Sequence, residues 1–192
     1  MIAATAIFSI SIAASKWLVA TYPVGEVLFF RASVSLVLFA GFAIATKGLS
    51  VFRTRRPVAH VMRGVSQGVS QSLQLIALGM MPIASVTAIN FSAPLFAALA
   101  SLHFLKEPVG AGRWVALTVG FLGVIIITNP GAETFQTGAL FALASAVLFG
   151  TVTAGVRGMT TTESAETLTL YQLILLAIFY SLSLPFAFVT PT

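Results

Sequence analysis

Three glutamines in one apolar segment carry the strongest chemical signal in this sequence. Gln67, Gln71 and Gln74 are spaced i, i+4 and i+7, so at about 100° per residue they lie within a ~60° stripe of a helix. An unsatisfied amide in hydrocarbon is costly, so all three need partners. The stripe, flanked by Arg63 and Ser70, predicts a wet cavity whose amides hydrogen-bond a substrate. The alternative is that the amides link neighbouring helices.

Two cations near the ends of apolar segments are further binding candidates. Arg31 lies about 9 Å inside its segment at 1.5 Å per residue. A charge at that depth marks a functional site by default, although its long stem also allows it to reach the head groups. Lys16 ends the first apolar segment and is the second candidate. Glu26 lies about 140° from Arg31 around the helix, so we expect it at the helix N-terminus and not facing Arg31.

A proline marks an irregular point in the fourth apolar segment. Pro94 cannot donate a hydrogen bond to the carbonyl of Asn90, so we expect a kink with a free acceptor there. That kink is either a substrate contact or purely structural. Gln172 in the last apolar segment is a further amide candidate for substrate binding.

Single histidines and spaced glycines have structural interpretations. His60 and His103 lie at the inner ends of segments, where we expect them at the membrane interface. Four glycines predict close contacts between helices, namely Gly64, Gly68, Gly120 and Gly123.

Several kinds of chemistry are excluded by residues that the sequence lacks. It has no cysteine, hence no disulfide or thiolate nucleophile, and no aspartate, hence no paired-aspartate protease. The apolar segments hold no cluster of histidine and glutamate, so we expect neither an enzyme nor a metal or organic cofactor. Every acidic residue lies in a predicted loop or helix end, and this favours facilitated transport or exchange over proton coupling. These residues are Glu26, Glu107, Glu133, Glu163 and Glu166.

The overall composition is that of an integral membrane protein. Hydrophobic residues make up 58% of the chain and charged residues 8%, whereas a soluble domain carries about 25% charged residues. The net charge of +5 does not indicate nucleic-acid binding, because the only cluster, Arg53, Arg55 and Arg56, lies between two apolar runs. Lipid is therefore the expected solvent, and the expected fold class is an all-α, multi-span helical bundle.

Seven segments are long and apolar enough to be spans or nearly so. Turn residues such as Tyr22-Pro23-Val24-Gly25 and Asn129-Pro130-Gly131 separate them, and connections this short make neighbouring helices antiparallel. The first segment is interpreted as a span and not a signal peptide, because no cationic region precedes it. The predicted spans are 2–20, 25–46, 58–79, 83–104, 113–129, 137–157 and 168–189.

Lysine and arginine set the expected orientation. With the N-terminus inside, the outer loops, about 20–25, 80–82 and 130–136, hold none. Every lysine and arginine except Lys16 and Arg31 lies in an inner loop or at an inner helix end. The positive-inside rule therefore predicts a multi-pass protein of a bacterial-type inner membrane with a cytoplasmic N-terminus. The inner cations are Lys47, Arg53, Arg55, Arg56, Arg63, Lys106, Arg113 and Arg157.

A weak internal repeat fits this topology. Phe8 precedes Lys16 by eight residues, and Phe149 precedes Arg157 by the same distance, while Arg31 aligns with Gln172. The first two spans would then match the sixth and seventh, with five spans in each repeat. An odd number of spans inverts the second copy, and inverted repeats are typical of transporters. The expected units are residues 1–131, a complete five-helix repeat, and 132–192, a partial second repeat of two helices.

Several short motifs, taken in order, resemble those of EamA-type transporters of the drug/metabolite transporter superfamily. They are the run Pro23 to Arg31, Ala88 to Leu95, Leu105-Lys106-Glu107-Pro108, Gly120 to Gly131, and Tyr171-Gln172. The resemblance implies two inverted five-helix repeats and transport of small metabolites, amino acids or drugs. It also implies a fragment, without about the last three helices and a short N-terminal stretch.

The expected function is thus a membrane transporter that works by alternating access, with the lipid bilayer and a small molecule as its partners. The oligomeric state is left open, with a homodimer as one option. One alternative is a non-transporting membrane assembly partner. Another is a seven-helix receptor, although a retinal protein would need a lysine in its last span and the last lysine is Lys106.

Overall fold

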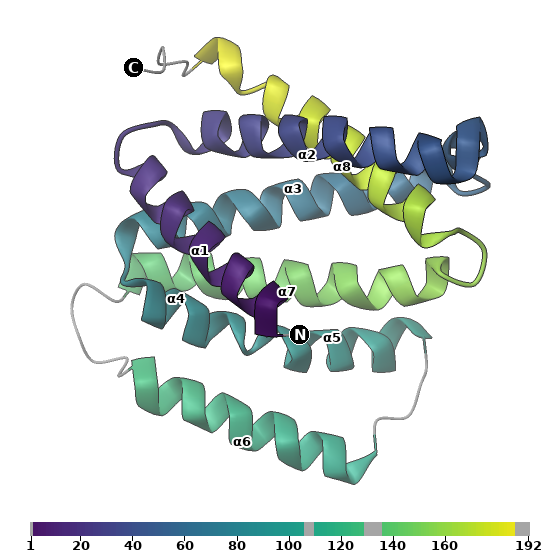
Figure 1. Ribbon diagram of the computed structural model, residues 1–192. Helices are drawn as coiled ribbons and strands as arrows, with labels where there is room; N and C mark the ends of the chain where they lie inside the picture. Colours follow the sequence, from purple (N-terminus) through teal and green to yellow (C-terminus); the bar gives the residue numbers. More distant parts are fainter. Residues whose placement is uncertain (1, 106–109, 129–135, 187–192) are drawn as a thin grey trace.

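The computed structural model describes residues 2–105, 110–128 and 136–186, and all regular structure in these ranges is helical (Figure 1). The predicted all-α class is confirmed. The elements are α1 (Ile2–Val19), α2 (Val24–Lys47), η1 (Gly48–Phe52), α3 (Pro57–Met80), α4 (Ile83–Asn90), α5 (Ala93–Ala100), the π-helical turn η2 (Ser101–Leu105), α6 (Ala111–Thr128), α7 (Gln136–Met159), α8 (Ala165–Ser181) and η4 (Leu184–Phe186).

Helix α3 is central in the bundle. It packs against α7 and α8, while α7 also lies along α4 and α5, and α8 also packs on α2. Helix α1 crosses α3 obliquely, and α6 packs on α4 and α5 at the edge of the bundle (Figure 1). The helices of 1–131 and 132–192 therefore interleave in one bundle. Their relation as inverted repeats stays a prediction.

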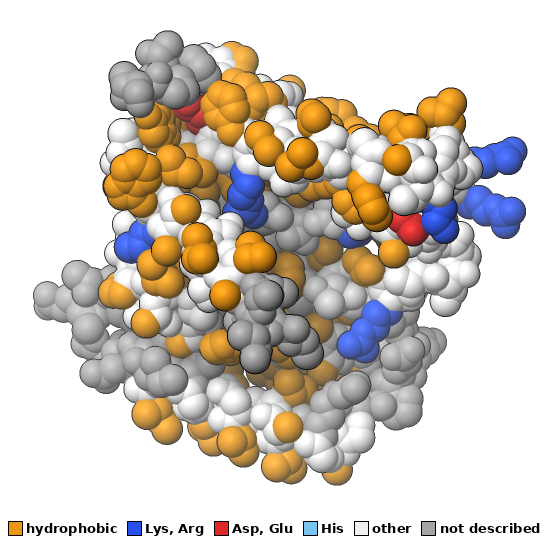
Figure 2. Space-filling model, in the orientation of Figure 1, with side chains coloured by type: hydrophobic (Ala, Val, Ile, Leu, Met, Phe, Trp, Pro, Cys, Tyr) orange, Lys and Arg blue, Asp and Glu red, His pale blue; other side chains and the backbone are white. Residues whose placement is uncertain are grey.

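The multi-span character is confirmed by the long apolar helices. Within the described ranges three helices are long and apolar enough to cross a membrane: Val24–Phe52, Ile83–His103 and Thr137–Met159. The apolar stretches in α1, α6 and α8 are shorter. Hydrophobic side chains cover much of the surface in Figure 2, as expected where lipid is the solvent. The total of seven spans stays a prediction.

The predicted fourth span is divided in two. Helix α4 ends at Asn90, and α5 begins at Ala93 with Pro94 in its first turn, where a missing N–H is tolerated. Ser92 lies buried between them, and its Oγ donates a 2.6 Å hydrogen bond to the Ile89 carbonyl. The irregular point predicted from Pro94 is present, as an interruption of the helix between Asn90 and Ala93.

Two of the four glycine predictions hold. A Cβ on Gly64 would lie 2.6 Å from the Leu175 side chain, and one on Gly68 would lie 2.8 Å from the Phe179 ring, so α3 and α8 approach closely there. The prediction for Gly120 and Gly123 is wrong within the described ranges, because a Cβ at either position would meet nothing within 4 Å. These two lie on α6, which packs on the bundle less closely than α3 does.

The last predicted helix begins and ends earlier than expected. Ser164 caps α8 by accepting a hydrogen bond from the Thr167 amide, so the helix begins at Ala165 and not at residue 168. It ends at Ser181, ahead of Pro185, and a short 3₁₀ turn follows. The end of the prediction, 187–189, lies outside the described residues.

Candidate functional site

A cavity of about 540 Å³ lies where α1, α2, α3, α4 and α7 meet. This volume is within the usual range of small-molecule sites. Five of the seven predicted binding residues line it, brought together from three helices: Arg31, Gln67, Gln71, Gln74 and Asn90. Residues of the first, second and fourth predicted spans thus line this cavity together with the glutamine stripe, and the role of the stripe in substrate binding stays a prediction.

The glutamine stripe is only partly engaged by the protein itself. Gln71 Oε1 accepts a 3.2 Å hydrogen bond from Arg31 Nη2. Within the described part of the chain, no side-chain hydrogen bond holds Gln67, Gln74 or Asn90. Gln67 is 5% exposed, so its amide is enclosed by helices and still borders the cavity. Amides in this situation are free to bind a guest or water.

Arg31 sets the charge of the cavity. Its guanidinium reaches the glutamine stripe from α2, and among the described residues none that lines the cavity is aspartate, glutamate, lysine or histidine. Glu26 is buried in the first turn of α2, as predicted, and does not line the cavity. The cavity therefore offers one cation and several amides, an environment that favours an anionic or neutral polar guest.

Hydroxyl groups and aromatic rings complete the cavity, and the sequence interpretation missed them. Ser11 and Ser15 come from α1, Ser35 from α2 and Thr87 from α4, while the rings belong to Phe91 and Phe149. Helical spacing could have found some of these residues. Ser11 and Ser15 are four residues apart, and Ser35 follows Arg31 by four, so each pair shares a helix face.

Lys16 does not reach the cavity. Its Nζ donates hydrogen bonds of 2.8 Å to the Leu78 carbonyl and 2.6 Å to the Met81 carbonyl. A cation is stabilised there, because the C-terminal end of a helix carries unpaired carbonyls and a partial negative charge. This geometry shows how Lys16 ties α1 to the end of α3.

Gln172 also lies outside the cavity lining. Its Oε1 accepts a hydrogen bond from Arg63 Nη2, and Arg63 Nη1 donates a 3.0 Å hydrogen bond to the Leu168 carbonyl. Arg63 thereby fastens the first half of α3 to α8. The structure thus joins Gln172 to the residue that flanks the glutamine stripe and not to the stripe itself.

His60 lies in the first turn of α3 and is packed against α8. It is 2% exposed, and its ring lies 4.6 Å from the ring of Tyr171, while its position at the membrane interface stays a prediction. Tyr171 in turn donates a 2.8 Å hydrogen bond to the Phe52 carbonyl. Among the described residues neither ring nitrogen of His60 has a hydrogen-bond partner, so the contact that the structure gives this histidine is its ring packing on Tyr171.

A carboxylate connects two loops near His60, and the region of these loops with His60 and Tyr171 is called the packed end below. Glu163, between α7 and α8, is 8% exposed, and its Oε1 accepts hydrogen bonds from Arg55 N at 2.8 Å and Thr54 Oγ1 at 2.9 Å. The Arg55 amide is the main reason that the pKa of this carboxyl lies below its ordinary value, since it stabilises the ionised form. The loop before α3 is thus fixed to the loop before α8.

Comparison with known proteins gives several clear matches. Residues 1–129 match the EamA-like transporter family. The chain is 31% identical over 170 residues to an S-adenosylmethionine uptake transporter of Rickettsia bellii, covering 87% of this chain and 57% of that protein. It is 30% identical over 195 residues to a riboflavin transporter of Rhizobium johnstonii, covering 100% and 64% respectively. No solved structure matches.

The family match extends over the helices that build the cavity from α1 to α5, and one relative aligns along the whole chain. The chain spans somewhat more than half the length of the curated relatives that it matches. Its amides and its arginine lie together in a cavity inside a bundle of apolar helices. The chain belongs to the EamA-like transporter family.

Proposed function

We propose that this protein carries a small polar metabolite across a bacterial-type inner membrane, with the cavity between α1, α2, α3, α4 and α7 as the binding site. One observation carries the proposal: Arg31, the three glutamines and Asn90 converge on a single cavity of about 540 Å³. Polar side chains that are free of protein partners and border a cavity in an apolar bundle are typical of a substrate pathway.

The lining favours a planar, nitrogen-containing substrate. An amide offers both a donor and an acceptor, as does the edge of a heterocycle, and Arg31 can hold a carbonyl, carboxylate or phosphate. Phe91 and Phe149 supply faces for stacking. The compounds named for the two relatives above, S-adenosylmethionine and riboflavin, both contain a fused nitrogen heterocycle, and the neutral riboflavin fits the charge of the cavity better than the cationic S-adenosylmethionine.

The proposed mechanism is alternating access by facilitated transport or exchange. Among the residues that the structure describes, no carboxylate lines the cavity, so none of them provides the acidic group whose protonation commonly gates proton-coupled carriers. Arg31 and Gln71 are already linked across α2 and α3, and a substrate that competes for this hydrogen bond would loosen the contact between the two helices. Binding would thereby couple to helix movement.

The test is flux into proteoliposomes that contain the purified protein. Uptake of radiolabelled riboflavin and S-adenosylmethionine is measured for the wild type, for Gln71→Leu and for the control Thr118→Val. Thr118 is exposed on α6, away from the cavity, and its hydroxyl bonds only its own helix. We expect Gln71→Leu to lower flux at least about tenfold, because one charge-assisted hydrogen bond is worth about 1.5–3 kcal/mol.

Equal flux in Gln71→Leu and in the wild type would exclude the glutamine stripe from transport. Absence of flux in wild-type vesicles that contain folded, inserted protein would favour the alternative of a non-transporting membrane assembly partner. Circular dichroism and the recovery of protein in the vesicles distinguish these outcomes from failed insertion.

A further inference from the structure

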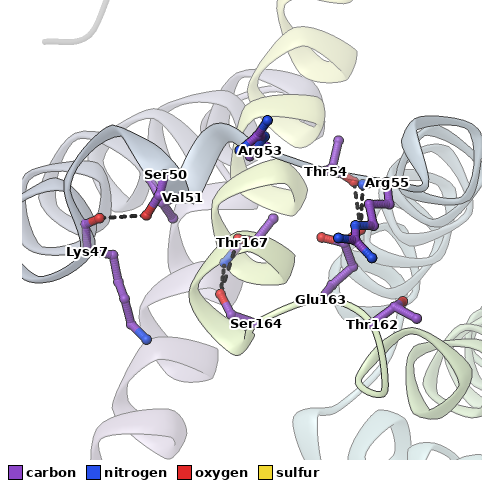
Figure 3. A pocket seen from close by; sticks show the side chains of 10 residues that line it. All are labelled: Lys47, Ser50, Val51, Arg53, Thr54, Arg55, Thr162, Glu163, Ser164 and Thr167. Atoms are coloured by element: carbon purple, nitrogen blue, oxygen red, sulfur yellow. Dashed lines mark hydrogen bonds between the residues drawn. The ribbon is translucent and has the colours of Figure 1, made fainter.

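A second cavity, of about 530 Å³, lies outside the proposed transport site. It is formed where α2 passes through η1 towards α3 and where α7 joins α8 (Figure 3). Lys47, Arg53 and Arg55 line it, together with the carboxylate Glu163 and several hydroxyl groups. None of its lining residues is among those of the first cavity.

The cavity has a net positive charge, and not all of its cations are held in ion pairs. Three cations line it against one carboxylate, and that carboxylate already accepts two hydrogen bonds from the loop before α3. Lys47 forms a 3.7 Å ion pair with Glu166. In the described part of the chain no ion pair holds Arg53, and its side chain is exposed. The cavity can therefore accept an anion without first breaking its own structure.

Hydrogen-bond donors also face the cavity. Ser164, the N-cap of α8, and Thr167, in the first turn of this 17-residue helix, lie between the arginines and Lys47, and their hydroxyl oxygens are 3.1 Å apart (Figure 3). The N-terminus of α8 adds a partial positive charge, and Glu166 in the same turn, which is paired with Lys47, offsets part of it. Cations, hydroxyls and a helix N-terminus together form a suitable environment for a phosphate group.

The surroundings indicate where the phosphate comes from. The 3₁₀ turn η1 continues the apolar helix Val24–Phe52, which is long enough to cross a membrane, so the cavity lies at one end of a span. Beside it η1 exposes two large apolar side chains, Leu49 at 76% and Phe52 at 41%. A free phosphate would not bury these apolar side chains, whereas the acyl chains of a lipid would cover them.

We propose that the cavity lined by Lys47, Arg53 and Arg55 binds the phosphate of an anionic phospholipid from the adjoining leaflet, with the glycerol and acyl chains lying over Leu49 and Phe52. The lipid would brace the connection between α2 and α3 against the connection between α7 and α8. Basic pockets at the membrane surface between helices are known to bind lipid head groups in this manner. The proposal does not depend on transport, only on insertion in a bilayer.

The experiment measures lipid-dependent stability of the purified protein in mixed micelles. Dioleoyl phosphatidylglycerol is titrated at constant detergent, the Tm is followed, and dioleoyl phosphatidylcholine serves as the neutral comparison. We expect a saturable rise in Tm with phosphatidylglycerol only. Arg53→Gln and Arg55→Gln should each weaken the apparent affinity for phosphatidylglycerol about fivefold. This is the factor in affinity that one lysine or arginine near an anionic membrane surface contributes.

Arg157→Gln is the matched control, since it removes one exposed cation from the end of α7 without touching the cavity. Its affinity should stay within about twofold of the wild type, and Arg55→Lys should retain most of the binding. An equal loss in Arg157→Gln and Arg55→Gln, or equal stabilisation by phosphatidylcholine, would overturn the proposal. Stabilisation by inorganic phosphate or sn-glycerol 3-phosphate at the concentration at which the lipid saturates would also overturn it, in favour of a free-anion site.

Discussion

Two groups of polar side chains on α3 behave in opposite ways. In one group, Arg63 is bound to the Leu168 carbonyl and to Gln172, and His60 packs on Tyr171. In the other group, the glutamine stripe, Gln71 is bound to Arg31, while in the described part of the chain no hydrogen bond holds Gln67 or Gln74. The first group faces α8, and the stripe borders the cavity.

The difference shows that the role of a polar residue in a membrane helix is not determined by its residue type. Where a neighbouring helix lies close, the polar residue hydrogen-bonds to it and links the two helices. Gly64 and Gly68 allow α8 to approach α3 closely, and Arg63 then bonds to α8. Where the neighbours stand apart, the same kind of side chain borders a cavity and stays available to a guest. Stability should therefore depend on the α3 residues that contact α8, and transport on the glutamine stripe.

The largest loss of stability is expected for Arg63→Ala. The change removes two donors to α8 and leaves the Leu168 carbonyl and Gln172 without them, at a cost of about 3 kcal/mol. Thermal or SDS unfolding of the purified protein measures it. Gln74→Ala on the same helix is the control, and an equal loss in both variants would contradict the division of α3.

Gly64→Ala should cost about 2 kcal/mol. Its Cβ would lie 2.6 Å from Cβ of Leu175, an atom close to the α8 backbone, so the helix itself would have to move. Gly79→Ala is the matched control, because there the new Cβ would meet only Val19 at 3.9 Å. The control should be neutral or slightly stabilising, since alanine favours a helix. Equal unfolding temperatures in the two variants would show that α3 and α8 do not pack as closely as described.

Acid should weaken the packed end by a smaller amount. The pKa of Glu163 is lowered from its ordinary value of 4.5, so the ionised carboxylate stabilises the fold fully above that pH. This contribution is lost as the pH falls below 4.5 through the pKa of the folded state. Comparing the pH dependence of Tm between wild type and Glu163→Gln measures it. Identical slopes in the two proteins would contradict the assigned role of Glu163.

The smallest effect on stability is expected on the cavity side. Gln67→Leu should change the free energy of unfolding by less than about 0.5 kcal/mol, because within the described residues that amide forms no hydrogen bond. Flux through the same variant should nevertheless fall, which sharpens the contrast with Arg63. A clear loss of stability in Gln67→Leu would mean that the stripe serves to hold helices together.

Much of the fold followed from local patterns. Long apolar segments between turns predicted the helices, since a bilayer requires every backbone group to be paired within the segment. Pro94 predicted the irregular point between α4 and α5, and the spacing of Gln67, Gln71 and Gln74 predicted one common face. The start of α8 was missed by three residues because the capping role of Ser164 was not used.

Other features depended on which helices became neighbours. By itself, the sequence determined that this chain is a helical membrane protein with an amide face on α3, because composition and helical period are properties of each segment alone. Only the tertiary structure decided that Lys16 and Gln172 lie outside the cavity and that Ser11, Ser15 and Phe149 line it. Whether a polar side chain meets a carbonyl, a ring or an open space is a property of helix packing, and helix packing depends on the whole bundle.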